Sequence, residues 1–264
     1  MTTAGAYLSV SRNLDRWRAI AANKPTVALE TKYFKANIGR ATSIDALLKD
    51  RRLFNYAMKA FGLGDRTNAL GMMRKVLEQG VDNSRDLART LSNANILAFA
   101  EAFDYAGGKA DVTSGDFVKT ITGRYVEQAL QAQQGETNPG VERALYFKAR
   151  APQLSSVYGV LADKNLLEVV QTTLNIPAAS AAQPIDTQAR LLKAKLNVED
   201  FKDPKKLEKF IARFAAMYDL NNPGAGTAAS ANANAILYGA SFLDQPVGVD
   251  VSLLLRRQNA ARGF

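Results

Sequence analysis

The sequence predicts an all-α, multihelical protein with few or no strands, in which a long helix joins two similar helical repeats at about residues 33–104 and 146–219. Apolar residues recur every three or four positions along most of the chain, which is the period of an α-helix. Residues that cap and stop helices stand at the ends of many of these segments. The stretch YFKA also occurs twice, at residues 33–36 and 146–149.

A first clear helix is expected over Asp50–Phe61. Its first residue, Asp50, can accept hydrogen bonds from the free N–H groups of the first turn. Leu53 and Ala57 then recur on one face, and Gly62 follows as a stop. This segment therefore has a start, a buried face and an end.

The following segments continue the helical pattern. Asp65 and Ser84 are expected to cap the next two helices. The longest helix is expected over Ser114–Gln134, where apolar residues keep helical spacing without a break. The stretch GETNPG at residues 135–140 predicts a turn, with Pro139 at the first position of another helix.

The rest of the chain predicts further helices and little else. Thr26–Glu30 and Pro246–Val251 are candidates for short strands, which would leave the fold class unchanged. Further helices are expected at Asp163–Leu174, Pro184–Leu196, Pro204–Leu220, about Ser230–Leu243 and from Asp250 onward.

The two YFKA stretches open a longer likeness between two parts of the chain. Tyr33 matches Tyr146 and Asp50 matches Asp163 at the same offset of 113 residues. Over residues 33–63 eight residues are identical at this offset, where chance would give about two. We therefore expect a duplication, with divisions at 1–112 (first repeat), 113–145 (connecting helix and turn), 146–220 (second repeat) and 221–264 (linker and C-terminal helices).

The composition excludes several kinds of catalytic site. The chain has no cysteine and no histidine, which excludes the usual zinc sites, the Ser-His-Asp triad and imidazole acid–base chemistry. Asp50 and Asp163 fit either helix caps or a carboxylate pair, and caps are favoured. Gly107-Gly108-Lys109 lacks the upstream glycine of a phosphate-binding loop. We expect no catalytic, cofactor-binding or metal-binding residue.

The charge suits an anionic partner but does not form one block. The net charge is +9 with a pI near 9.7, and the cations are spread along the chain. Protein partners are therefore expected and nucleic acid is not favoured. No cleavable signal peptide is expected, because the N-terminus lacks a basic opening followed by an apolar run. No transmembrane segment is expected either, because the uncharged residues 221–243 are rich in Ala, Asn, Gly and Ser. The C-terminal segment offers candidate partner contacts at Phe242, Leu243, Leu254, Arg256 and Arg257.

Several stretches carry a resemblance to a known family: TKYFKANI, LLKDRRLFNYAMKAFGLGD, MMRKVLEQGVD, DLARTLSN, FAEAFDY, RYVEQAL and GVERALYFKAR. Together, over Thr31 to Arg150, they resemble a bacterial family of uncharacterised helical domain proteins. Its members are frequently encoded among flagellar genes, and some carry the label of flagellar basal-body rod protein. The resemblance implies a flagellar setting and no catalytic residues.

These observations lead to one favoured function and two alternatives. The favoured one is a non-enzymatic helical module, cytoplasmic or associated with the flagellar basal body, that acts in flagellar structure or assembly through protein contacts. The first alternative is a basic regulatory or nucleic-acid-associated protein, which the net charge of +9 suggests. The second is an enzyme that uses carboxylates or lysine on a small substrate.

Overall fold

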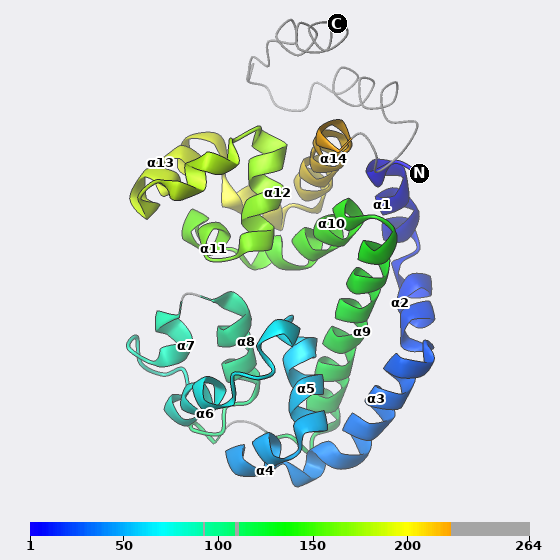
Figure 1. Cartoon of the computed structure of the whole chain (residues 1–264), viewed down its shortest axis with the longest axis vertical. Coiled ribbons are helices and arrows are strands. Elements are labelled where there is room, and N and C mark those ends of the chain that lie inside the picture. The colour runs from blue at the N-terminus through cyan, green and yellow to red at the C-terminus, as the bar shows by residue number, and fades with distance from the viewer. Residues whose placement is uncertain (92, 109–110, 223–264) are drawn as a thin grey trace, which may run out of the picture.

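The computed structural model describes residues 1–91, 93–108 and 111–222, and these residues form an all-α protein (Figure 1). No strand occurs among them, which confirms the predicted fold class. The helices are α1 Thr3–Arg12, α2 Leu14–Ala22, α3 Pro25–Asn37, α4 Ile44–Lys49, α5 Arg51–Ala60, α6 Leu70–Gln79, α7 Leu87–Thr90, α8 Ala94–Ala102, α9 Gly115–Thr137, α10 Pro139–Arg150, α11 Val157–Leu161, α12 Lys164–Leu174, α13 Ile185–Lys195 and α14 Pro204–Asn221.

Two hydrophobic cores lie at the two ends of α9 (Figure 1). The first core is built from α3 to α9, and Phe34 lies at its centre with no exposed surface. Its ring stacks on Tyr56, which in turn stacks on Tyr125 of α9. The second core is built from α1 and α10 to α14, and Phe147 is equally buried there. Aromatic burial on this scale supplies much of the driving force for folding.

The long helix is present as predicted, but the turn after it is not. Ser114 caps α9 by accepting a hydrogen bond from the Phe117 N–H at 3.1 Å. The helix then continues to Thr137, so the predicted turn over residues 135–140 is reduced to Asn138 alone. That residue ends α9 and also caps α10, because its Oδ1 accepts from two backbone N–H groups of the next helix.

Three local predictions are corrected. Thr26–Glu30 is not a strand but the first part of α3, because Pro25 fits the first helical position and Val27 packs into the first core. Asp65 lies in a short 3-10 helix, and α6 begins later at Leu70. Ser84 does not cap a helix either, since α7 is preceded by Asp86.

Two parts of the chain contain helices in a similar order, which differs at one position, where the first has α7 and the second the 3-10 helix Val198–Lys202. The first runs α3, η1, α4, α5, η2, α6, α7 and α8, and the second runs α10, η3, α11, α12, η4, α13, η5 and α14. The five 3-10 helices in these series are η1 Ile38–Arg40, η2 Gly64–Arg66, η3 Ala151–Gln153, η4 Ala178–Ala182 and η5 Val198–Lys202. In the first part, α3 to α5 overlap residues 33–63, over which the likeness in sequence holds at an offset of 113 residues.

The N-terminal helix α1 packs with the second core, whose other helices begin only at Pro139 (Figure 1). Tyr7 and Val10 are buried there against α10 and α14. The Thr3 N–H donates to both carboxylate oxygens of the buried Asp219, at 3.0 and 2.9 Å. The boundaries of the four predicted divisions stay a prediction. Helix α1 falls within the first of them, residues 1–112, but packs outside the first core.

Some predictions fall outside the described residues. These are the helices about Ser230–Leu243 and from Asp250 onward, and the candidate strand Pro246–Val251. Among the described helices, none combines the length and the apolar content that crossing a membrane requires.

Candidate interaction surface

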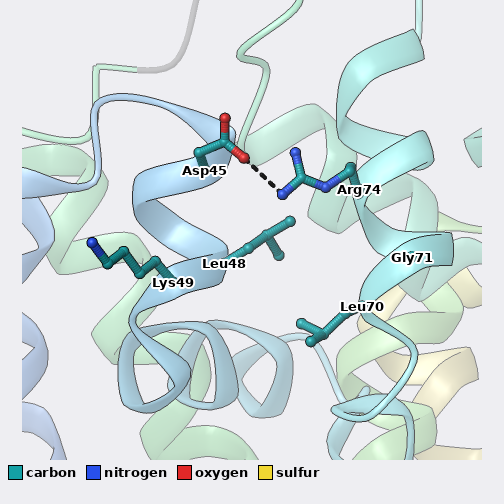
Figure 2. A pocket seen from close by; sticks show the side chains of 6 residues that line it. All are labelled: Asp45, Leu48, Lys49, Leu70, Gly71 and Arg74. Atoms are coloured by element: carbon teal, nitrogen blue, oxygen red, sulfur yellow. Dashed lines mark ion pairs between the residues drawn. The ribbon is translucent and has the colours of Figure 1, made fainter.

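A shallow groove of about 320 Å³ lies between α4 and α6 (Figure 2). Leu48 and Leu70 form its apolar part, and Asp45 and Arg74 approach each other across it at 2.7 Å. Lys49 also borders the groove. The ion pair is largely exposed, so screening by solvent leaves it little effect on stability. The groove has a charged rim and a small apolar floor, which suits a surface contact better than an enclosed small-molecule site.

A second depression of about 380 Å³ lies beside α5 and α9. Arg52 and Glu30 form a two-pronged ion pair there, with both N–O distances at 3.0 Å. The Arg52 guanidinium also lies 4.0 Å from the centre of the Tyr33 ring. Tyr56 and Tyr125 stack at the same place, and burial raises the pKa of both phenols. These contacts hold the walls of the depression together.

A tyrosine bonds to an aspartate at the same position in both parts of the chain. The Tyr33 hydroxyl donates to Asp50 Oδ2 at 2.8 Å, while Asp50 Oδ1 accepts from two N–H groups at the start of α5. The Tyr146 hydroxyl donates to Asp163 Oδ2 at 2.6 Å, while Asp163 Oδ1 caps α12 in the same way. Each aspartate is a cap, as predicted, and also fixes a tyrosine.

These tyrosines hold their protons more firmly than free phenols. The hydrogen bond to Asp50 raises the pKa of Tyr33. Burial raises the pKa of Tyr146, and the charge of Asp163 adds to the shift. The two aspartates lie at the starts of different helices and each already accepts three hydrogen bonds, so their arrangement is that of two separate caps.

The described residues contain no group of three or more acidic side chains that could hold a metal ion. The candidate partner contacts Phe242, Leu243, Leu254, Arg256 and Arg257 lie outside the described residues. They stay a prediction.

The outer face of α3 combines apolar and basic side chains at the surface. It consists of Ala28, Leu29, Lys32, Lys35 and Ala36, which are all exposed and lie on one side of the helix. Leu29 is 59% exposed, the largest exposed fraction of any leucine among the described residues. The sequence does not reveal this face, because Thr26–Glu30 has the pattern of a short strand, in which these residues would not share one side.

The sequence around this face is also strongly basic. Residues 12–40 contain seven basic and two acidic residues, a net charge of +5 out of +9 for the whole chain. Ile20, on the neighbouring α2, is 41% exposed. In Figure 1, α2 and α3 form the outer column beside α9. Exposed apolar side chains among like charges are typical of a surface that binds a partner of opposite charge.

A protein-family model and a solved structure are similar to this chain. The family model described as Protein of unknown function (DUF1217) matches residues 60–207. The crystal structure of a protein from Agrobacterium tumefaciens, solved by a structural genomics consortium, is 36% identical and has a TM-score of 0.78. The match covers 84% of this chain and 94% of that chain. No curated protein matches the chain.

Proposed function

The chain belongs to the DUF1217 family of proteins, and we propose that it is a non-enzymatic helical module that binds other proteins in flagellar structure or assembly. It would work at the flagellar basal body or in the cytoplasm beside it. The observation that carries the proposal is the outer face of α3, where Leu29 is exposed between basic side chains. An apolar centre with a charged surround is the arrangement that protein interfaces commonly have.

The presence of two parts with a similar helix order supports a role of the chain as a scaffold. We infer that they arose by duplication, because the Tyr–Asp pairs Tyr33–Asp50 and Tyr146–Asp163 occupy matching positions and make matching contacts. The long helix α9 contacts α5 of the first part and α10 of the second. A long helix that connects two similar helical parts suits a scaffold that binds other proteins.

The flagellar part of the proposal is supported by the family resemblance in the sequence, whose members are frequently encoded among flagellar genes. Deletion of the gene should reduce motility and flagellation, and the wild-type gene on a plasmid should restore both. Full motility and normal flagella in the deletion strain would remove this part of the proposal.

The charge supports a second candidate, a basic protein associated with nucleic acid. The net charge of +5 over residues 12–40 would attract phosphates as well as carboxylates. The test is titration of the purified chain into labelled DNA and RNA at low and high salt. Binding that weakens steeply with salt would support this candidate, and absence of binding at low salt would exclude it.

A further inference from the structure

We propose that the outer face of α3 is the docking site for an acidic amphipathic helix of a partner protein. The inference rests on the proposed interaction function and names the class of partner. Three observations carry it: the way the matching helix α10 is covered, the contacts of one lysine there, and the charge around α3.

In the second part of the chain, helices cover much of the face that matches the outer face of α3, where Glu142 and Lys148 are half-buried and Ala149 stays exposed. Ala28 and Lys32 are exposed on α3, whereas their matches Val141 and Leu145 on α10 are only 1% and 2% exposed. Helices α1 and α14 pack against α10. In α3 the same side of the helix faces solvent, so it has the geometry to receive a helix.

The lysine that matches Lys35 shows which chemistry such a helix would use. Lys148 Nζ donates to the Glu208 carboxylate of α14 and lies over the ring of Tyr7 from α1. The Tyr7 hydroxyl donates to the same carboxylate at 2.8 Å. Lys35 is exposed and has no ion-pair partner among the described residues. A carboxylate on a docked helix would bind Lys35 in the way that Glu208 binds Lys148.

Charge decides between the occupants that could cover this face. The surrounding stretch, residues 12–40, has a net charge of +5, so an acidic partner is attracted to it. A second copy of the chain would bring a net charge of +9. Residues 223–264 contain three basic and two acidic residues and offer no acidic surplus. The geometry and the charge therefore point to a separate acidic helix, with Leu29 as its apolar anchor.

The test is direct binding of a designed helix to the purified full-length chain. The probe is a fluorescein-labelled amphipathic peptide with a leucine stripe flanked by glutamates, and a matched probe carries glutamines instead. Fluorescence anisotropy should show that the glutamate probe binds about tenfold or more tightly than the glutamine probe at low salt. The preference should shrink at high salt.

Three variants locate the site. Lys35→Glu and Leu29→Asp should each weaken the glutamate probe about tenfold or more, and both change exposed residues, so folding should be retained. Ile185→Asp is the matched control, because Ile185 is 58% exposed on α13 in the second part of the chain. In the Lys35→Glu variant, the preference for the glutamate probe over the glutamine probe should also shrink.

The proposal is overturned by equal binding of the two probes, by no binding of either, or by binding that Lys35→Glu leaves unchanged. Light scattering on the same variants adds a further outcome. A wild-type dimer that Leu29→Asp converts to a monomer would assign the face to a second copy and overturn the acidic-helix proposal. Since the assay uses purified chain alone, its failure leaves the flagellar proposal standing, and a motile deletion strain leaves this result standing.

Discussion

At the scale of the residue, the tyrosine–aspartate pair is the feature that the two parts of the chain share most closely. One carboxylate oxygen of Asp163 caps a helix, and the other accepts from a tyrosine that is 7% exposed. The pair therefore joins the start of α12 to the middle of α10. Asp50 and Tyr33 join α5 to α3 in the same way, although at a more exposed place.

Removal of the buried hydroxyl should cost measurable stability. Tyr146→Phe is expected to lower the free energy of unfolding by about 1–2 kcal/mol, since the hydroxyl donates to a charged group. Tyr33→Phe should cost less, because solvent competes at this site. Urea unfolding of Tyr146→Phe, Asp163→Ala and the double variant measures the coupling. Additive losses would show that the two side chains do not act together.

The raised pKa of Tyr146 makes stability depend on alkaline pH. A phenol whose pKa is higher in the folded chain than in the unfolded chain stabilises the fold below the unfolded value of about 10. This contribution is lost as pH rises above that value toward the folded pKa. Urea unfolding between neutral and alkaline pH should show a decline that Tyr146→Phe reduces. An identical decline in both chains would contradict the assignment.

The positions of the tyrosine–aspartate pairs could be predicted from the sequence, but the contact within each pair could not. The offset of 113 residues matched Tyr33 with Tyr146 and Asp50 with Asp163 from identity alone. It did not show that each tyrosine bonds to its aspartate, because the partners lie 17 residues apart on different helices. That contact depends on how the helices cross, and single-residue propensities carry no information on crossing.

At the scale of the element, α9 and α10 follow each other with a single residue, Asn138, between them. Gly140 lies in the first turn of α10, where a Cβ would come within 2.5 Å of the Tyr218 ring and 2.7 Å of Thr3. Gly123 lies in the middle of α9 on an exposed side, and a Cβ there would meet nothing within 4 Å. Close packing therefore requires a glycine at position 140 but not at position 123.

Alanine at these two positions should change stability in opposite directions. Gly140→Ala is expected to lower the free energy of unfolding by about 1–3 kcal/mol, because the methyl group has to displace α1 or Tyr218. Gly123→Ala is expected to raise it by about 0.5–1 kcal/mol through helix propensity. Thermal unfolding of both variants measures the two signs. A stabilising Gly140→Ala would contradict the close packing of α1 on α10.

Elements were predicted well where periodicity was long and poorly where signals were local. The spacing over Ser114–Gln134 gave the long helix, since many residues support one period. Thr26–Glu30 was misassigned because β-branched residues favour strands locally, whereas burial of Val27 and Phe34 decides for a helix. The cap residues Asp65 and Ser84 were wrong for a similar reason, because Asp and Ser also favour turns.

At the scale of the whole molecule, α1 ties the N-terminus to the second core. The buried bond from the Thr3 N–H to Asp219 joins residues 216 positions apart. Periodicity could not predict this contact, because α1 has the pattern of any amphipathic helix. The outer face of α3 could not be predicted either, because the packing of the other helices decides which helix faces stay exposed.

Deletion of residues 1–12 should loosen the second core and spare the first. Loss of Tyr7 and Val10 would expose apolar surface of α10 and α14. Hydrogen exchange followed by mass spectrometry should show faster exchange in α10 and α14, with little change in α5 and α6. Equal acceleration in both cores would mean that the cores unfold as one unit.

The most direct test of the central claim asks where the chain resides and whether the outer face of α3 holds it there. Mass spectrometry should quantify wild-type, Leu29→Asp and Ile185→Asp chains in purified basal bodies and in the soluble fraction of the same cells. The account predicts that the wild-type and Ile185→Asp chains are enriched with basal bodies, and that Leu29→Asp shifts to the soluble fraction. Wild-type chain found only in the soluble fraction, or equal retention of all three, would contradict it.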